Sequence, residues 1–176
     1  MPFTPFHWGY SVLFLALIPF LDPFSLFAGS IAPDFEGITA LFILPGSGLP
    51  LHGILHSFMG TAILAIITGI CSWASFRFII PRLIRTTPTD FTFPQYTLKV
   101  SLLSSSIGTF SHIILDSPLY EEMDLFYPLK FGNPWYNIVP SSVVYFSCIL
   151  SLFLGISILF LRYVFFTTQK SSKQEF

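Results

Sequence analysis

The chain has 176 residues, of which 53% are hydrophobic and only 10% are charged, and its mean hydropathy is +0.73. Soluble domains carry about 25% charged residues, so the composition excludes an ordinary soluble protein and predicts an integral membrane protein whose main partner is the lipid bilayer. The net charge of −1 leaves no excess of basic residues with which to bind nucleic acid, so we expect no nucleic-acid partner.

The apolar segments, taken in chain order, predict an all-α, polytopic membrane helix bundle of about four spans. The first segment, residues 10–27, is interrupted by Pro19 and by Asp22-Pro23. Proline is poorly tolerated inside a helix, so this segment is expected to be either one kinked span or two short helices. The other candidate spans are residues 51–80, 98–117 and 141–166.

Polar or proline-rich stretches separate these spans. Residues 28–50 are rich in Gly and Pro and are expected to form a loop with a short helix, while residues 118–140 are expected to form an irregular loop. The acidic residues of the loop 118–140 are expected to face solvent: Glu121, Glu122 and Asp124. We predict a single membrane helical domain, residues 1–166, followed by a polar cytoplasmic tail, residues 167–176.

Basic residues predict the orientation of the bundle in the membrane. They gather around the second connection and at the end of the last span: Arg77, Arg82, Arg85, Lys99, Arg162, Lys170 and Lys173. The first and third connections hold one basic residue between them, Lys130. By the positive-inside rule, the second connection and the C-terminus are cytoplasmic. Polar residues of the remaining connections then lie at the non-cytoplasmic face: Asp34, Glu36, His52, His56, His112, Asp116 and Glu121.

The position of His7 depends on the path of the first segment. A single crossing places His7 on the cytoplasmic side, away from the other polar residues. A short helix that dips into the membrane and returns, as the breaks at Pro19 and Pro23 permit, brings His7 to the opposite face. The sequence leaves both paths open.

Two ionisable pairs stand in the apolar segments. His52 and His56 are four residues apart, as are His112 and Asp116, and on a helix each pair projects from one face. Ionisable groups in such surroundings indicate a functional site. Imidazole and carboxylate are common protein ligands of zinc and similar divalent ions. We therefore predict that the two pairs converge on a divalent metal, with zinc as the preferred ion.

Two carboxylates of the Pro33-Asp34-Phe35-Glu36 stretch are expected to complete this site. Asp34 is expected to be a metal ligand and a catalytic carboxylate, and Glu36 to be the general base or to orient a ligand. Structural roles stay open as alternatives. The histidines can form hydrogen bonds between helices, and Asp34 can cap a short helix.

Small residues form stripes on the last two spans. The stripes are Ser101, Ser105 and Gly108 on the third span and Ser147, Ser151 and Gly155 on the last. Such stripes usually indicate close helix packing. The stripe on the third span leads to His112 and Asp116, so it could also line a hydrated cavity.

Several short motifs occur in a fixed order along the chain. They are Thr-x-x-His (4–7), Gly-Ser-x-x-Pro-Asp (29–34), His-Gly-x-x-His-Ser (52–57), His-x-x-x-Asp (112–116) and Tyr-Pro-Leu (127–129). The set resembles the YdjM-type family of prokaryotic inner-membrane metal-dependent hydrolases, most of all its small archaeal members. The resemblance implies a multi-pass plasma-membrane hydrolase with these polar-site residues: His7, Asp34, His52, His56, His112 and Asp116.

The chain departs from that family pattern at two positions. Glu36 stands where the family often has Asp, and Gly53 stands where many members have Arg. A looser similarity to zinc-dependent phospholipases C, through the N-terminal His, the Pro-Asp pair and His-x-x-x-Asp, implies phosphoester chemistry on a lipid-like substrate.

Three functions are compatible with these residues. The first is a membrane metallohydrolase that uses metal-activated water on a phosphoester or acyl bond of a lipid-like substrate. The second is a small transporter or metal carrier, since broken helices and buried polar residues are transporter features. The third is a non-catalytic membrane scaffold whose polar residues join helices.

Overall fold

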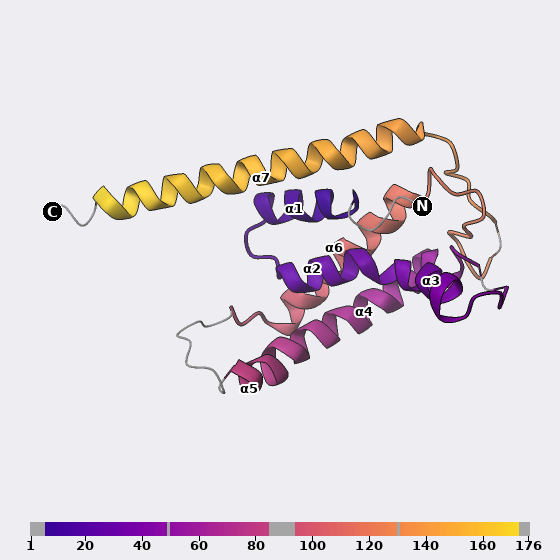
Figure 1. The fold of residues 1–176 in the computed structure, drawn as a ribbon, viewed down its shortest axis with the longest axis horizontal. Helices are drawn as coiled ribbons and strands as arrows, with labels where there is room; N and C mark the ends of the chain where they lie inside the picture. Colours follow the sequence, from indigo (N-terminus) through magenta and orange to yellow (C-terminus); the bar gives the residue numbers. More distant parts are fainter. Residues whose placement is uncertain (1–5, 49, 85–93, 130, 173–176) are drawn as a thin grey trace.

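The computed structural model describes residues 6–48, 50–84, 94–129 and 131–172, and within these ranges the protein is all helical (Figure 1). Four helical runs are long and apolar enough to cross a membrane: Pro23–Ile43, Phe58–Arg82, Leu98–Asp116 and Ser141–Thr167. The predicted all-α membrane bundle of about four spans, with a broken first segment, is confirmed. Four residues used in the sequence arguments lie outside the described ranges: Thr4, Arg85, Lys130 and Lys173.

The first segment folds as a helical hairpin. Helix α1 (Trp8–Leu17) has ten residues, a length of about 15 Å, which is too short for a hydrocarbon core of about 30 Å. Helix α2 (Pro23–Ile31) begins after the break and runs back beside α1 (Figure 1). The first segment therefore forms two short helices between which the chain reverses direction, and this is the path that brings His7 to the other polar residues.

Asp22 starts the returning helix. Its Oδ1 accepts hydrogen bonds from the backbone N–H groups of Phe24 and Ser25, at 3.0 and 3.4 Å, which satisfies donors that the first turn of a helix leaves unpaired. Pro23, the first residue of α2, has no N–H to leave unpaired and has a backbone angle suited to a helix start. The Asp22-Pro23 dipeptide therefore fixes the point at which the returning helix α2 begins.

Helix α7 (Ser141–Ser172) packs along α1. A Cβ at Gly9 would collide with the backbone carbonyl of Cys148, and a Cβ at Gly155 would lie 2.7 Å from the backbone nitrogen of Leu13. At the deep end of α1, Arg162 donates a hydrogen bond of 2.9 Å to the carbonyl of Ala16. A cation there complements the negative end of the helix dipole. Helix α7 also continues beyond Thr167 into the segment that we expected to be a separate polar tail.

The centre of the bundle consists of α6 (Leu98–Asp116) packed between α2 and α4 (Phe58–Ala74). α4 is extended by η5 (Ser75–Ile79) and α5 (Ile80–Ile84). A Cβ at Gly29 would lie 2.5 Å from the carbonyl of Ser105, so α2 and α6 are in backbone contact. The small-residue stripe of the third span thus serves helix packing, as one of its two interpretations predicted.

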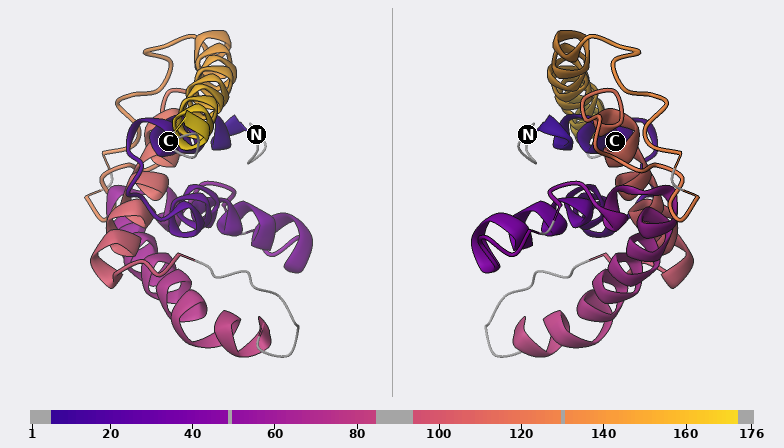
Figure 2. Two further views of the ribbon diagram at one scale, coloured as in Figure 1. Left: turned by 90° about the vertical axis from the view of Figure 1, so that its left-hand side faces the viewer. Right: turned by 90° about the vertical axis from the view of Figure 1, so that its right-hand side faces the viewer.

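An apolar arm follows α2 and leaves the bundle sideways (Figure 2). It consists of η2 (Ala32–Asp34), α3 (Phe35–Ile38) and η3 (Thr39–Ile43). Its exposed residues are almost all apolar: Phe35, Ile38, Leu41, Phe42 and Ile43. Exposed apolar area of this kind marks a membrane or protein contact. The run Pro23–Ile43, counted above as a candidate span, therefore bends where α2 gives way to the arm.

Candidate metal centre

The polar residues singled out by the sequence meet at one end of the bundle. The elements that carry them begin or end there, on the right-hand side of Figure 1. His7 precedes α1, Asp34 ends η2, His56 ends η4 (Ile54–His56), and His112 and Asp116 lie in the last turn of α6. All five side chains are buried, with at most 8% of each residue exposed. An ionisable cluster of this kind in apolar surroundings is costly unless its members are paired or bind a cation.

Four of these residues can reach a single point. One ligand atom from each of Asp34, His56, His112 and Asp116 lies within 4.8 Å of the others. Nε2 of His112 is 3.6 Å from Oδ1 of Asp34 and 3.2 Å from Oδ2 of Asp116. Ligand atoms bound to one zinc ion at 2.0–2.2 Å are separated by roughly 3–4 Å. The buried cluster could therefore hold a metal ion.

The orientation of His112 favours a cation between these groups. Its Nδ1 lies 2.7 Å from the carbonyl oxygen of Ser30, and a carbonyl can only accept, so Nδ1 carries the proton. In neutral His112 the lone pair of Nε2 then faces the carboxylates of Asp34 and Asp116. This buried nitrogen forms no hydrogen bond with any described residue. A metal ion, or a proton, is needed to make that arrangement favourable.

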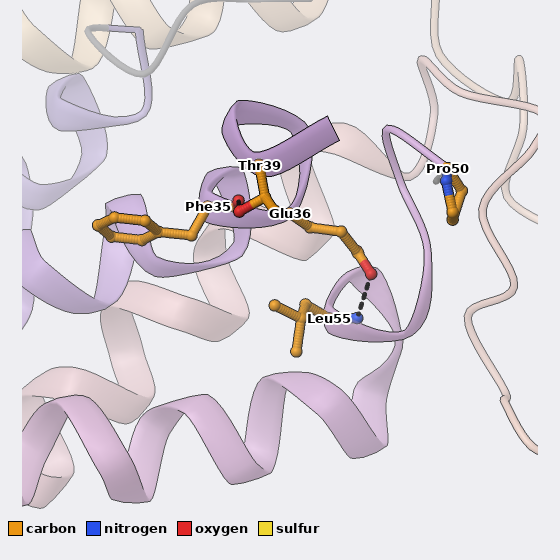
Figure 3. Close-up of a pocket in the computed structure, with 5 residues that line it drawn as sticks. All are labelled: Phe35, Glu36, Thr39, Pro50 and Leu55. Carbon is orange, nitrogen blue, oxygen red and sulfur yellow. Dashed lines mark hydrogen bonds between the residues drawn. The ribbon is translucent and has the colours of Figure 1, made fainter. Parts of the chain in front are cut away.

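Like His112, His56 has one ring nitrogen bonded to a neighbouring group and the other buried without a hydrogen bond to a described residue. Its Nδ1 is 3.1 Å from Oε2 of Glu36, while its buried Nε2 has no hydrogen-bond partner within the described part of the chain. Glu36 also accepts hydrogen bonds from the backbone N–H groups of Gly53 and Leu55, at 2.8 and 3.4 Å. Figure 3 shows the bond to Leu55. Glu36 thus orients the His56 ring from outside the cluster.

His7 lies at the edge of the cluster. Its ring stacks on that of His112, with centroids 4.0 Å apart, and its Nε2 is 3.3 Å from Oδ1 of Asp116. Neither ring nitrogen of His7 forms a hydrogen bond with a residue that the structure describes. Asp116 therefore has one histidine beside each of its carboxylate oxygens.

His52 is adjacent to the cluster but outside the group of four. Its ring centroid is 4.8 Å from that of His56, its ring stacks on Tyr120, and its Nδ1 is 2.8 Å from Oε1 of Glu122. Burial lowers the pKa of His52 below 6.5, more than the hydrogen bond to Glu122 raises it. Partial burial raises the pKa of Glu122, but a backbone hydrogen bond and the bond to His52 bring it below its ordinary value. His52 is thus held as a neutral imidazole.

No family model, no curated protein and no solved structure matches this chain. The description of the site therefore rests on the contacts above. They bring the two sequence pairs together, since the ring centroids of His56 and His112 are 5.6 Å apart.

Sequence reasoning predicted the orienting role of Glu36 but missed the groups that orient the other histidines. Glu122 was expected in a solvated loop, yet it pairs with His52 from a position 70 residues later. The hydrogen bond of His112 to the Ser30 carbonyl could not be predicted either, because a backbone acceptor carries no sequence signal. The separation of these partners along the chain leaves no spacing pattern that could have identified them.

Proposed function

We propose that the protein is a membrane-embedded hydrolase that depends on a zinc ion bound by Asp34, His56, His112 and Asp116. The observation that carries the proposal is the buried Nε2 of His112, which faces the carboxylates of Asp34 and Asp116 while its Nδ1 is bonded to the carbonyl of Ser30, together with the equally buried and unbonded Nε2 of His56 in the same group of four. Two imidazoles and two carboxylates form a nitrogen and oxygen ligand set suited to zinc. With one coordination position left for water beside these residues, the zinc ion would supply a water of lowered pKa and would polarise the carbonyl or phosphoryl oxygen of a substrate.

His7 is the best-placed group for proton transfer beside this centre. Its Nε2 lies 3.3 Å from Asp116, and neither of its ring nitrogens is committed to a described hydrogen-bond partner. An imidazole beside a carboxylate can accept a proton and deliver it again. Glu36, the base expected from the sequence, has its carboxylate engaged by Gly53, Leu55 and His56. We therefore assign Glu36 a positioning role.

The substrate is proposed to be lipid-like, with a phosphoester or acyl bond at the centre. The site lies at the end of the membrane spans and next to an exposed apolar arm. The basic residues Arg77, Arg82 and Lys99 lie at the opposite end of the bundle (Figure 1). Together with the positive-inside rule, this arrangement supports a site at the non-cytoplasmic face of the plasma membrane.

The two alternative functions have less support. A transporter needs a polar path through both leaflets, but beneath the cluster α2 and α6 are in backbone contact at Gly29 and Gly108. A scaffold needs its polar side chains bonded to one another, but several buried ring nitrogens in the described part of the chain are not.

Purified protein in phospholipid nanodiscs tests the proposal. We expect bound zinc and a slow release of fatty acid or phosphorylated product that stops on chelation and returns with zinc. His56→Ala and Asp116→Asn should each reduce the rate by at least about 100-fold, whereas the exposed loop variant Glu121→Gln should not. Hydrolysis that is insensitive to chelation and to both variants, or an absence of hydrolysis by zinc-loaded protein across phospholipid and acyl-ester substrates, would contradict the proposal.

A further inference from the structure

A pocket of about 240 Å³ opens beside the candidate metal centre. It lies between the apolar arm and the loop that precedes α4, as Figure 3 shows. The residues that line it are Phe35, Glu36, Thr39, Pro50 and Leu55. Pockets that enclose a whole drug-sized ligand measure roughly 300–1,000 Å³, so this pocket fits one segment of a larger molecule.

The pocket and the metal centre share two stretches of chain. Phe35 directly follows Asp34, and Leu55 directly precedes His56. Glu36 stands between the two sites, because it lines the pocket and its Oε2 lies 3.1 Å from Nδ1 of His56. A molecule in the pocket is therefore separated from the centre by little more than the Glu36 side chain.

The polar groups of the pocket are already engaged. The Thr39 hydroxyl donates a 2.7 Å hydrogen bond to the carbonyl of Phe35, and the Glu36 carboxylate accepts from Gly53 and Leu55. What remains for a ligand is apolar surface from Phe35, Pro50 and Leu55. The negative charge of Glu36 also disfavours a phosphate group in this position.

Exposed apolar residues surround the pocket. Phe35 is 58% exposed and Ile54, beside Leu55, is 47% exposed. The rest of the arm continues this apolar surface away from the bundle (Figure 2). A chain entering from the bilayer would thus move from lipid to the pocket without crossing a charged surface.

We propose that this pocket binds a segment of one acyl chain of a bilayer phospholipid and so directs the polar end of the same lipid toward the metal centre. The proposal rests on the proposed function for the role of the polar end, but the pocket and its occupant can be tested separately. It names phospholipid as the substrate class and the arm as the route of entry.

Photo-crosslinking in nanodiscs tests the occupant. Phosphatidylcholine with a diazirine on one acyl chain should label residues 35–39 and 50–55 more strongly than the lipid-facing surface of α4. Thr39→Trp, which fills the pocket, should reduce that labelling at least about tenfold. Ile66→Trp, on the exposed face of α4, is the matched control and should leave it unchanged. Leu55→Phe is a smaller pocket-filling change that should also reduce labelling and that serves if Thr39→Trp does not fold.

The readouts separate the two proposals. Zinc content, measured on the same samples, should stay unchanged in Thr39→Trp and Ile66→Trp. Pocket labelling by acyl-chain probe in protein that binds no zinc would reject the metal centre and keep the pocket. Labelling no stronger than that of α4, labelling unaffected by both pocket variants, or preferential labelling by a headgroup-diazirine probe would overturn the pocket proposal.

Discussion

The imidazole rings of His7 and His112 stack with their centroids 4.0 Å apart, although His7 precedes the first helix and His112 lies near the end of α6. The contact exists because α1 turns back at Asp22 instead of crossing the membrane. It also places His7 3.3 Å from Asp116, on the oxygen that does not face His112. The hairpin is therefore the element that completes the candidate centre.

The ligand group predicts different outcomes for two neighbouring histidines. His112→Ala removes a member of the group of four and should reduce bound zinc to a small fraction of the wild-type content. His52→Ala removes a histidine that is bonded to Glu122 outside that group, so most of the zinc should remain. Elemental analysis of purified protein measures both. Equal zinc loss in the two variants would show that His52 is itself a ligand, and unchanged zinc in His112→Ala would reject the centre.

Glu36 should act through His56. Glu36→Gln keeps the shape of the side chain and an acceptor for Gly53, but removes the charge beside Nδ1 of His56. Loss of such an outer partner typically weakens metal binding about 10–100-fold. Competition with a chelator of known affinity measures this, and Glu121→Gln is the control. A lowered hydrolysis rate with unchanged zinc affinity would instead identify Glu36 as the general base.

Contact between α2 and α6 should be sensitive to one added side chain. A Cβ at Gly108 would collide with the carbonyl of Leu26, so Gly108→Val forces the helices apart. Overpacking of this kind costs about 1–3 kcal/mol. Thermal unfolding in detergent should show a clear drop in the unfolding temperature. Ala62→Val, at an exposed position of α4, should unfold like the wild type, and an equal drop in both variants would contradict the packing argument.

Asp22 should stabilise both the hairpin and its contact with α6. Besides capping α2, its Oδ2 accepts hydrogen bonds from the hydroxyls of Ser25 and Ser101, at 2.5 and 2.7 Å. Asp22→Ala removes the cap, which costs about 0.5–2 kcal/mol, and leaves a buried hydroxyl of α6 without its acceptor, which adds about 1–3 kcal/mol.

The matched control for Asp22 is the cap of α6. Thr97→Ala removes a single exposed cap bond to Val100, so it should lower stability less than Asp22→Ala. Asp22→Asn, which retains an acceptor for the helix start, should fall between the two. Chemical unfolding in detergent ranks the three variants. Equal effects of Asp22→Ala and Thr97→Ala would mean that the buried bond to Ser101 contributes nothing.

The orientation of the site can be read from cysteine accessibility. With Cys71→Ser and Cys148→Ala as background, Glu121→Cys lies in the loop at the site end and Thr167→Cys at the opposite end. A membrane-impermeant maleimide should label Glu121→Cys in intact cells. It should reach Thr167→Cys only after the membrane is opened. The reverse pattern would place the site at the cytoplasmic face.

Gly53 and Glu36, the two positions at which the sequence differs from the family pattern expected from its motifs, contact each other. A Cβ at Gly53 would lie 2.6 Å from Oε1 of Glu36. Because Gly53 has no side chain, the Glu36 carboxylate has room to accept a hydrogen bond from the N–H group of Gly53 and to reach Nδ1 of His56. The two departures are therefore linked by space, a relationship that neither position reveals alone.

Local sequence signals predicted the last three candidate spans and the pair His112 and Asp116, whereas the first candidate span, Pro23–Ile43, covers a stretch that we expected to be a loop, and His52 and His56 do not share an α-helix. Apolar runs interrupted by proline predicted the helices because hydrocarbon accepts only internally bonded backbone. Helical spacing placed His112 and Asp116 on one face. Both signals come from residues that are close in sequence, so both can be detected without a structure.

Only the tertiary structure decided which distant groups complete the site. The return of His7 depends on how α1 packs against α7 through Gly9 and Gly155. The pairing of His52 with Glu122 and the pocket beside Glu36 likewise join segments far apart in the chain. Such contacts follow from the packing of whole helices and loops, which no residue spacing encodes. The sequence by itself thus predicted the later membrane helices and the four residues of the ligand group, while the close approach of the helices decided which partners orient them.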